Sequence, residues 1–394
     1  MKILVVIPSV GSVYGGPSKS VVELTKAIGI QGIEVDIVTT TANGDHQLDV
    51  PLLTWIRENE YRIQYFPYIS QGDYKFSFKL TKWLYAHVKD YNLVHTNAIF
   101  SLTNIPAYWA CQKYNIPYLI TPRGMLQSWA LSYKAGKKKI YYSLLEKPAI
   151  NRSNGIQILA TAEKDEVQAL NLKPPLFIIP NGVNKENFEN LPSSSLFLEQ
   201  FPEAKNKQLI LFLGRIDPKK GLDLLAPAFA NVHQKFSNIH LIIAGPDNVG
   251  YLTTAKKYFQ DLDCLSAVTF TGILTGEIKY SALSAANIYV APSYSEGFSM
   301  SILEGMASGL PCIFTTGCNF PEAGEANAAY VVDINSGSIE KALITCLENP
   351  EEAKKMGDRA KEFIFDNYTW DKIAKKLIKV YQKIINERYT KKMS

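Results

Sequence analysis

Short apolar runs alternate with helix-like patterns along almost the whole chain, and this alternation limits the possible folds more than any other feature. Strand-like runs separated by helical segments are typical of parallel sheets flanked by helices. The runs fall into two series, which predict an α/β protein with two such sheets. The first series comprises Ile3 to Pro8, Val35 to Thr39, Leu93 to His95, Tyr118 to Thr121, Ile156 to Ala160 and Leu176 to Ile179. The second comprises Leu209 to Leu213, His240 to Ala244, Val268 to Thr271, Ile288 to Ala291, Cys312 to Thr315 and Tyr330 to Val332.

The length of 394 residues is too great for one ordinary core and predicts two domains. A Pro-Asn-Gly-Val sequence at 180–183 and a polar, Ser-rich stretch at 186–200, which offers few core residues, separate the two series. We therefore place the hinge there. We predict two doubly wound, Rossmann-like domains, 1–182 and 183–365, that face each other across a cleft where ligands bind. The helical segment 366–394 is expected to pack back on the first domain.

The composition is that of an ordinary soluble globular enzyme, with 46% hydrophobic and 20% charged residues. A formal net charge of +5 is too small by itself to indicate a nucleic-acid-binding protein. The five cysteines form no CxxC pair and are odd in number, which argues against a disulfide framework and fits a reducing cytoplasm. No apolar run approaches the roughly 20 residues that span a bilayer. We expect Met1 to Pro8 to be a buried first strand rather than a signal peptide.

Two glutamates, Glu296 and Glu304, mark the strongest candidate for a functional site. A strand-like run that ends at Pro292 precedes them, and a helix is predicted from Met300 to Ala307. Glu296 then lies in the strand-to-helix loop and Glu304 about two helical turns further on, so both carboxylates can border one ligand. The backbone N–H groups at the helix N-terminus suit an anion such as a diphosphate.

Two other strand-to-helix loops have the composition of phosphate-binding sites. A Gly-rich loop with Gly15 and Gly16 precedes a helix predicted from Lys19 to Ile28, although a turn without a ligand explains this loop equally well. Arg215 and Lys220 follow the first strand of the second series. A planar Arg fork and a movable Lys charge suit a diphosphate leaving group, and the alternative is a pair of solvated surface cations.

Taken together, these motifs resemble the retaining glycosyltransferases of family 4, which have the GT-B fold. The resemblance runs over almost the whole chain. The two-glutamate motif with its Gly-Phe is specific, whereas the glycine loop is not. The matching segments are Gly15-Gly16, Gly214-Arg215 to Lys220-Gly221, Pro180-Asn181-Gly182-Val183 and Glu296 to Glu304. Within the family, Thr121 to Leu131 looks most like enzymes that assemble bacterial exopolysaccharide or envelope polysaccharide.

The resemblance implies a role for each matching position. Arg215 and Lys220 would hold the donor diphosphate and, with Glu296, would act in catalysis. Glu304 would accept hydrogen bonds from the ribose of the nucleotide, while Glu296 would contact hydroxyls of the donor sugar. The other donor-binding positions are Gly272 and Ile273 by the base, Ser299, Met300 and Ser301 through their amides at the diphosphate, Gly297 and Phe298 at the sugar, and Gly15 and Gly16 where the first helix approaches the phosphates.

On the acceptor or sugar side, the resemblance points to His95, Asn97 and Arg123. His95 is the candidate for the histidine that the first domain contributes to the reaction, and the alternative is a structural hydrogen-bonding residue. The chain departs from a common family pattern here, because Asn97 stands where many relatives carry the second His of His-x-His. If the second His of that pattern is the functional one, the role passes to Asn97 or is lost. Arg123 stands where some relatives have His, which would alter how the acceptor or the donor sugar is held.

The implied reaction is the transfer of a hexose, with retention, from a nucleotide diphosphate sugar, with UDP as the expected nucleotide. The implied acceptor is a glycan or a lipid-linked oligosaccharide in polysaccharide biosynthesis. We expect neither a metal nor a cofactor, because two cations and a helix N-terminus can stabilise the leaving group. The Asp261-Leu262-Asp263 sequence is interpreted as surface charge. The alternatives are a nucleotide-sugar epimerase, a glycan phosphorylase and a non-catalytic nucleotide-sugar-binding protein of the same fold.

Residues 121–152 combine basic and aromatic residues with a single acidic one, Glu146. Such a face, centred on Lys134 to Lys147, suits an anionic membrane surface that carries a lipid-linked acceptor. The alternative is a solvated helix whose aromatic side chains pack inward. No recognised module supports nucleic acid as a partner, and we expect a cytoplasmic protein, peripheral at the inner membrane face if the first reading holds. The basic residues are Arg123, Lys134, Lys137, Lys138, Lys139, Lys147 and Arg152, and the aromatic ones are Trp129, Tyr133, Tyr141 and Tyr142.

Overall fold

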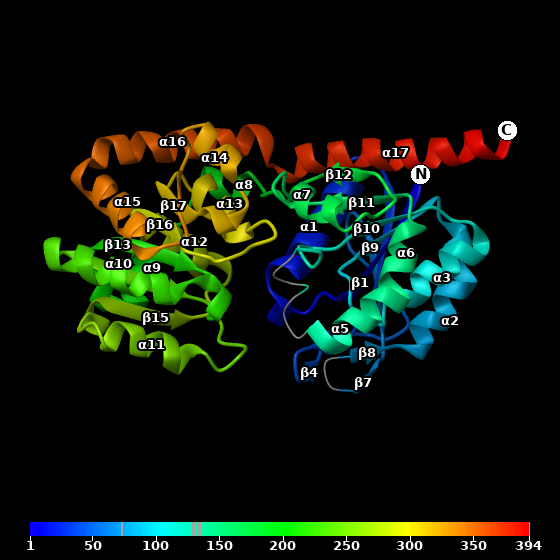
Figure 1. Ribbon diagram of the computed structural model, residues 1–394, viewed down its shortest axis with the longest axis horizontal. Helices are drawn as coiled ribbons and strands as arrows, with labels where there is room; N and C mark the ends of the chain where they lie inside the picture. Colours follow the sequence, from blue (N-terminus) through cyan, green and yellow to red (C-terminus); the bar gives the residue numbers. More distant parts are fainter. Residues whose placement is uncertain (72–73, 128–130, 132–134, 394) are drawn as a thin grey trace. The chain divides into compact units, whose positions relative to one another are not determined.

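The computed structural model describes residues 1–71, 74–127, 131 and 135–393 (Figure 1). The chain divides into two units, each built around its own parallel sheet. Unit 1 comprises Met1–Gly182 and Trp370–Ser394, and unit 2 comprises Val183–Thr369. Within the described ranges, no helix combines the length and the apolar character that crossing a membrane requires.

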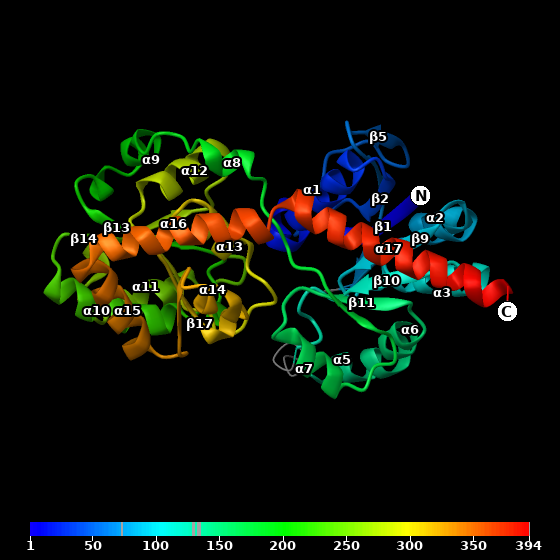
Figure 2. The ribbon, with the colours of Figure 1, turned by 90° about the horizontal axis from the view of Figure 1, so that it is seen from above.

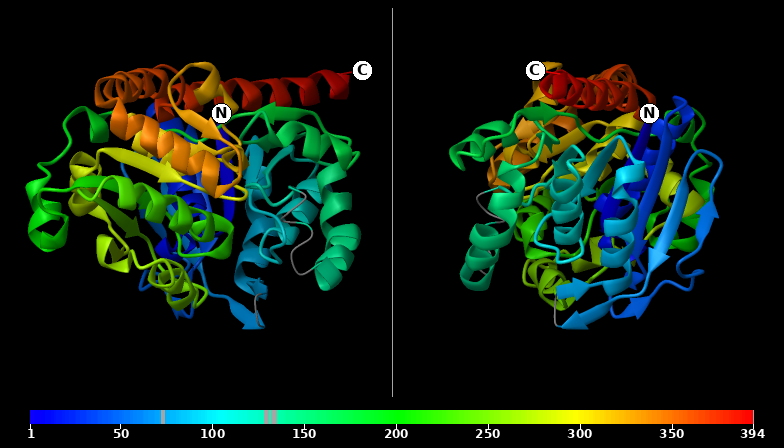
Figure 3. Two further views of the ribbon diagram at one scale, coloured as in Figure 1. Left: turned by 60° about the vertical axis from the view of Figure 1, so that its left-hand side comes forward. Right: turned by 90° about the vertical axis from the view of Figure 1, so that its right-hand side faces the viewer.

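The sheet of unit 1 has eight strands in the order β12-β11-β10-β9-β1-β2-β6-β5. Part of this sheet is visible in blue to cyan in the right-hand view of Figure 3. All pairs are parallel except the edge pair of β5 and β6. The strands are β1 (Lys2–Ser9), β2 (Glu34–Thr40), β5 (Trp55–Arg57), β6 (Arg62–Phe66), β9 (Leu93–Asn97), β10 (Tyr118–Thr121), β11 (Gly155–Ile158) and β12 (Leu176–Ile178). Two small hairpins flank it, β3 (Ala42–Asn43) with β4 (His46–Gln47) and β7 (Ile69–Gln71) with β8 (Tyr74–Phe76).

The helices of unit 1 include one from the far end of the chain. This helix, α17 (Trp370–Met393), packs against α1 (Gly16–Ile30) (Figure 2). The C-terminal segment thus packs on the first domain, as predicted. Its buried stripe recurs at helical spacing and includes Trp370, Leu377 and Tyr381. The others are α2 (Phe78–His87), α3 (Ile105–Tyr114), α5 (Ala135–Tyr141), a π-helical turn Tyr142–Glu146, α6 (Lys147–Asn151) and α7 (Glu163–Ala169).

The sheet of unit 2 has six parallel strands in the order β15-β14-β13-β16-β17-β18. They are β13 (Gln208–Leu213), β14 (Ile239–Ala244), β15 (Val268–Gly272), β16 (Ile288–Ala291), β17 (Cys312–Thr315) and β18 (Tyr330–Val332). The helices are α8 (Glu186–Glu189), α9 (Ser195–Gln200), α10 (Leu222–Lys235), α11 (Leu252–Gln260), α12 (Gly276–Ala285), α13 (Met300–Ala307), α14 (Pro321–Glu325), α15 (Ser336–Glu348) and α16 (Pro350–Asn367).

Both sheets are doubly wound, as predicted, and each has a point where the strand order reverses. In unit 1 the reversal lies between β1 and β9, and in unit 2 it lies between β13 and β16. The loops that leave two such neighbouring strands diverge to opposite faces of the sheet, which opens a crevice at their carboxyl ends. The Gly-rich loop follows β1 and the Arg215 to Lys220 loop follows β13, so both motifs lie at reversal points.

The stretch 186–200 contributes few core residues, as expected, but the two that it does contribute are large aromatic side chains. Phe188 and Phe197 are 2% and 0% exposed, respectively. Helix α9 packs against α12, where the Phe197 N–H donates to Ser281 Oγ at 2.9 Å, and the ring of Phe188 meets that of Tyr280 edge to face. Two large aromatic side chains thus anchor a segment that is otherwise polar.

Candidate functional site

Two loops of unit 2 approach each other closely where β13 and β16 end. Gly221 has a φ of 70°, and a Cβ atom there would lie 2.0 Å from the carbonyl oxygen of Pro292. Only glycine fits, because it tolerates both the left-handed backbone and the approach. The Tyr294 N–H donates to the Lys219 carbonyl at 2.9 Å and joins the loops. This contact brings the turn Pro218–Lys220 onto the loop that carries Glu296.

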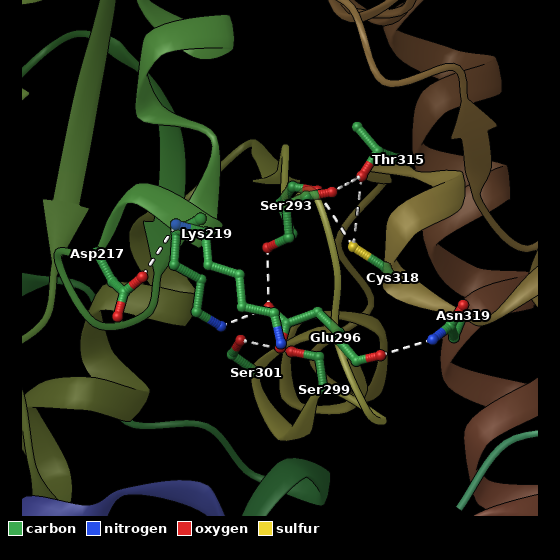
Figure 4. Close-up of polar contacts among 11 residues, drawn as sticks. Asp217, Lys219, Ser293, Glu296, Ser299, Ser301, Thr315, Cys318 and Asn319 are labelled. Carbon is green, nitrogen blue, oxygen red and sulfur yellow. Dashed lines mark hydrogen bonds and ion pairs between the residues drawn. The ribbon is translucent and has the colours of Figure 1, made fainter. Parts of the chain in front are cut away.

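Glu296 and Lys220 form an ion pair at this junction. Lys220 Nζ donates to Glu296 Oε1, and each side chain is 13% exposed. Ser293 Oγ donates to the same carboxylate oxygen at 2.8 Å (Figure 4). Burial alone would raise the pKa of Glu296, but Lys220 and then Lys219 outweigh it and hold the pKa below its ordinary value. Glu296 is therefore an ionised acceptor at neutral pH.

The backbone of Glu296 is held as firmly as its side chain. Its N–H donates to the Gly317 carbonyl at 2.7 Å, and Asn319 Nδ2 donates to its carbonyl at 2.6 Å (Figure 4). A Cβ atom on Gly317 would lie 2.4 Å from the Tyr294 carbonyl oxygen, so the turn Thr316–Cys318 requires glycine there. The sequence analysis did not identify Ser293 or Asn319, since nothing local reveals that the loop after β17 contacts the loop after β16.

The Lys220 loop contains more positive charge than the sequence analysis assigned to the site. Arg215 is exposed, whereas Lys219 is partly buried. Burial lowers the pKa of Lys219, the neighbouring charges of Lys220 and Arg215 lower it further, and Glu296 opposes them. Lys220 and Lys219 thus interact electrostatically with one carboxylate, and Arg215 interacts with Lys219. Such a cluster attracts an anion with several charges.

Helix α13 begins beside this cluster without a side-chain cap. Its N-cap, Ser299, is extended and makes no capping hydrogen bond, and the first turn contains no acidic residue. Ser299 Oγ and Ser301 Oγ instead contact each other at 3.1 Å. A helix start that lacks a side-chain cap can direct its N–H groups at an anion. Farther along, Gly305 lets α13 pack on β16, because a Cβ atom there would lie 2.7 Å from the ring of Tyr289.

The Phe298 side chain points into the interior rather than toward a ligand. It is 8% exposed and packs on the rings of Phe320 and Tyr368, with centroid distances of 5.0 and 5.8 Å. Any contact that Phe298 makes with a sugar is therefore through its backbone. Gly272, with a φ of 72°, ends β15, and Ile273 after it is 56% exposed.

Glu304 lies on α13 and is 7% exposed. Its Oε1 accepts a hydrogen bond from Lys279 Nζ of α12 at 2.8 Å. The structure therefore gives each predicted glutamate a lysine partner, Lys220 for Glu296 and Lys279 for Glu304. Lys279 was not predicted as a site residue, because it belongs to no motif and is separated from Glu304 by a strand and a loop.

In unit 1, Asn97 and Arg123 lie together. Asn97 Oδ1 accepts from Arg123 Nη2 at 2.7 Å and from Nε at 3.1 Å, and Arg123 Nη1 donates to Asn181 and Ser20 at 3.0 and 3.1 Å. Burial lowers the pKa of Arg123 to about 10. This arginine is thus part of an internal network and not of a basic surface face, which corrects one member of that predicted set. Nearby, Gly15, with a φ of 69°, is the N-cap of α1, which begins at Gly16 rather than at Lys19.

His95 is 1% exposed, and both of its ring nitrogens have partners. Nδ1 lies 2.6 Å from Tyr381 Oη of α17, and Nε2 lies 2.6 Å from Thr121 Oγ1. Burial, and then the charge of Arg123, lower the pKa of His95 to about 3, so the ring is neutral. This geometry favours the structural alternative, in which His95 fastens α17 to the sheet. Its part in catalysis stays a prediction.

Among the residues that the structure describes, no three His, Cys, Asp or Glu side chains gather where they could hold a metal ion. The Asp261-Leu262-Asp263 sequence follows the end of α11 and is exposed. That the protein binds its nucleotide without a metal ion stays a prediction, which binding measurements in the presence of a chelator can test. Of the basic and aromatic set, Trp129, Tyr133 and Lys134 lie outside the described residues.

Each half of the chain matches a protein family. Residues 14–187 match the family described as Glycosyltransferase Family 4, and residues 195–363 match the family described as Glycosyl transferases group 1. The chain also matches many curated proteins. One is the GDP-mannose-dependent alpha-(1-6)-phosphatidylinositol monomannoside mannosyltransferase of Mycobacterium tuberculosis, 25% identical over 209 residues, which are 50% of this chain and 54% of the relative. The chain thus spans about half the length of the curated relatives it matches first.

Solved structures resemble the fold over nearly its full length. The sucrose-phosphate synthase of Thermosynechococcus elongatus has a TM-score of 0.78 at 20% identity and covers 98% of this chain and 100% of its own. The Anabaena protein Alr3699/HepE, crystallised in complex with UDP-glucose, has a TM-score of 0.75 at 16% identity and covers 97% of this chain and 100% of its own. At these identities the likeness shows the shared fold alone.

Proposed function

Because this chain belongs to the glycosyltransferases of family 4 and group 1, we propose that it transfers a hexose from a nucleotide diphosphate sugar to a glycan or lipid-linked acceptor. The observation that carries this proposal is the loop junction in unit 2, where Lys220 pairs with the partly buried Glu296 next to Lys219, Arg215 and the uncapped start of α13. A diphosphate is the substrate group that this arrangement fits best, because it needs several cations and N–H donors together.

The same groups would promote departure of the diphosphate. As the bond between the sugar C1 and the phosphate oxygen breaks, negative charge develops on that oxygen. Lys220, Arg215 and the amides of Ser299 to Ser301 would stabilise this charge without reorganising. Lys219 adds a further cation. Because these groups already carry the charge, we infer that no metal is required.

The two glutamates would bind different parts of the donor. Glu296, ionised and fixed by Ser293 and Asn319, would accept hydrogen bonds from hydroxyls of the donor sugar. Glu304 would accept hydrogen bonds from the ribose. The acceptor hydroxyl would attack C1 on the face from which the diphosphate departs, and its proton would pass to the leaving oxygen. The configuration at C1 is then retained.

We infer UDP as the nucleotide and polysaccharide biosynthesis as the setting. The Anabaena protein of the same fold was crystallised with UDP-glucose, whereas the mycobacterial relative is named for GDP-mannose, so both nucleotides occur among similar proteins. Asn97 and Arg123, which form one network in unit 1, are proposed to contact the acceptor or the sugar.

Calorimetric titration in EDTA with UDP, GDP, ADP and their sugar conjugates tests this function. We expect one nucleotide to bind without metal, and one of its sugar conjugates to bind more tightly. Transfer to an added acceptor would distinguish a transferase from an epimerase, which needs none. If none of the nucleotides bound, the proposed diphosphate site would be wrong. If binding required Mg²⁺, the metal-free part would be wrong.

We also propose that unit 1 contacts the anionic cytoplasmic face of a membrane. Ile140 of α5 and Leu144 of the following π-helical turn are 64% and 69% exposed, and Lys139 beside them is exposed as well. Apolar side chains four residues apart on one helical face, next to a lysine, suit insertion between anionic head groups. Lys147 is less suited to this role, since its Nζ lies 3.4 Å from the Leu170 carbonyl oxygen.

Sedimentation with vesicles of phosphatidylglycerol and phosphatidylcholine tests the membrane contact. We expect the intact protein to sediment with mixed vesicles but not with phosphatidylcholine alone. The double variant Ile140→Ser, Leu144→Ser should lose most of this binding, whereas Ile30→Ser, which alters another exposed isoleucine at 61% exposure, should retain it. Equal sedimentation of both variants would favour the simple solvated helix.

A further inference from the structure

Lys279 of α12 has no role in the reaction proposed above, yet it contacts a residue that does. Its Nζ donates to Glu304 Oε1 at 2.8 Å, and the side chains are 13% and 10% exposed. The ammonium group also lies 4.6 Å from the centroid of the Tyr280 ring. Lys279 is thus fixed by a carboxylate and an aromatic face at once.

The burial of this pair distinguishes it from the ion pairs on the surface of unit 2. Lys235 Nζ and Glu348 Oε1 lie 2.6 Å apart, but their side chains are 51% and 48% exposed. An exposed pair contributes little and exchanges readily with water. A largely buried pair is different, because each charge depends on the other for compensation and neither side chain can move away without loss. Lys279 therefore helps to hold the Glu304 carboxylate in place.

The pair also links two parts of the proposed nucleotide site. Helix α12 begins at Gly276, a few residues after Gly272 and Ile273, which are proposed to lie by the base. Glu304 belongs to α13, whose start is proposed to bind the diphosphate. Lys279, near the start of α12, thus links α12, which follows the loop proposed to contact the base, to α13, whose start is proposed to bind the diphosphate. The ribose is the part of a nucleotide that joins these two groups.

We propose that Lys279 is a positioning residue that orients Glu304 toward the ribose hydroxyls of the donor nucleotide. This inference rests on the proposed function, because it assumes that a nucleotide binds here. Lysine is a donor without an acceptor, so toward the carboxylate it can only donate and cannot exchange roles with it. The carboxylate then acts as a pure acceptor with a fixed direction, which is what recognition of two vicinal hydroxyls requires. Lys279 contributes to discrimination between ribose and deoxyribose rather than to overall affinity for diphosphate.

The test compares UDP and GDP with their 2′,3′-dideoxy analogues, by calorimetry on the full chain. We expect the wild-type protein to prefer the ribonucleotide that it binds by about tenfold or more, which is the scale of hydrogen bonds to a charged acceptor. Lys279→Met should weaken the binding of that ribonucleotide by a similar factor, and should weaken the binding of its dideoxy analogue much less. Lys279→Arg, which keeps the charge, should retain part of the preference for the ribonucleotide over its dideoxy analogue. Lys235→Met removes the exposed lysine described above and should leave both affinities unchanged.

A double substitution keeps the inference testable if Lys279→Met does not fold. Glu304→Gln with Lys279→Met removes both charges together, which avoids leaving one buried charge uncompensated. If Lys279 acts only through Glu304, this variant should bind the ribonucleotide as weakly as Glu304→Gln alone, within about twofold. An additional loss in the double variant would mean that Lys279 contacts the ligand itself, and would overturn the positioning role.

Two other results would also overturn it. One is an equal loss of affinity for the ribonucleotide and its dideoxy analogue in Lys279→Met, which would indicate a general charge effect. The other is a wild-type protein that binds UDP or GDP without preferring ribose, which would refute this inference while leaving the transferase intact. Absence of binding to every nucleotide would instead refute the proposed function, and the inference with it.

Discussion

Replacement of Lys220 by methionine is expected to reduce the rate of sugar transfer by about 10²–10³-fold, or about 3–4 kcal/mol in the barrier. Lys220 serves two purposes in the proposed site. It compensates the buried carboxylate of Glu296, with both side chains 13% exposed, and it would stabilise the charge that develops on the departing diphosphate. Methionine keeps most of the length of the side chain and removes the charge on which both effects depend.

The loss should appear in kcat as well as in nucleotide affinity. Without Lys220, Glu296 retains the nearby charge of Lys219, which interacts with it electrostatically, so the loop need not unfold. Steady-state kinetics with the donor identified by titration, together with the Kd for the free nucleotide, would separate the two parts. Lys235→Met, which breaks an exposed pair elsewhere in unit 2, is the matched control. An unchanged kcat and Kd would remove Lys220 from the site.

Most strands were predictable because a buried strand of a parallel sheet has a continuous run of apolar residues, which is visible in the local sequence. The observed β16 and β17 have the predicted bounds, Ile288–Ala291 and Cys312–Thr315, since continuous apolar runs of this length are typical of a strand covered on both faces. Helix α13, Met300–Ala307, was also predicted to the residue. By contrast, β6 was missed, because Arg62 and Gln64 interrupt its apolar pattern. Arg62 is retained there by the buried Asp36, from which its Nη2 lies 2.6 Å.

The contacts of the candidate site were less predictable than the residues that form it. Glu296, Glu304 and Lys220 stand in recognisable motifs, but their arrangement depends on segments distant in sequence. The close approach of Gly221 to Pro292 and of Gly317 to Tyr294 decides which loops touch. No local pattern contains this information, because each glycine is explained equally well as an ordinary turn residue.

For His95, too, contacts with segments distant in sequence were not predictable. The predicted strand Leu93 to His95 placed it at a strand end, where chemistry is common in such folds, and this made a functional role reasonable. The observed β9 continues to Asn97, so His95 lies in the middle of the strand. Whether a buried histidine can act depends on its partners, however, and one of them, Tyr381, comes from α17 at the far end of the chain. A hydrogen bond between residues so far apart in sequence leaves no trace in the strand pattern. Only the packing of α17 on unit 1 reveals it.

Replacement of Glu296 by glutamine is expected to lower kcat by at least about 100-fold while leaving UDP affinity unchanged or increased. Glutamine has nearly the shape of glutamate, so Ser293 and Asn319 should still hold the residue. It cannot offer an ionised acceptor to the sugar hydroxyls, and a lost hydrogen bond to a charged group accounts for about 1.5–3 kcal/mol. If two such contacts strengthen in the transition state, the loss in kcat reaches the expected range.

The opposite change in nucleotide affinity follows from the electrostatics of the unliganded site. The Glu296 carboxylate lies against Lys220 and holds part of the positive charge that a diphosphate would otherwise attract. Removing that carboxylate leaves the cations uncompensated until UDP binds. The affinity for free UDP should therefore rise, although the rate of sugar transfer falls. Calorimetry with UDP and kinetics with the UDP-sugar measure the two changes on the same preparation, and Glu348→Gln, at an exposed pair, is the control. A fall in UDP affinity in proportion to kcat would mean that Glu296 binds the nucleotide, and that its role has been exchanged with that of Glu304.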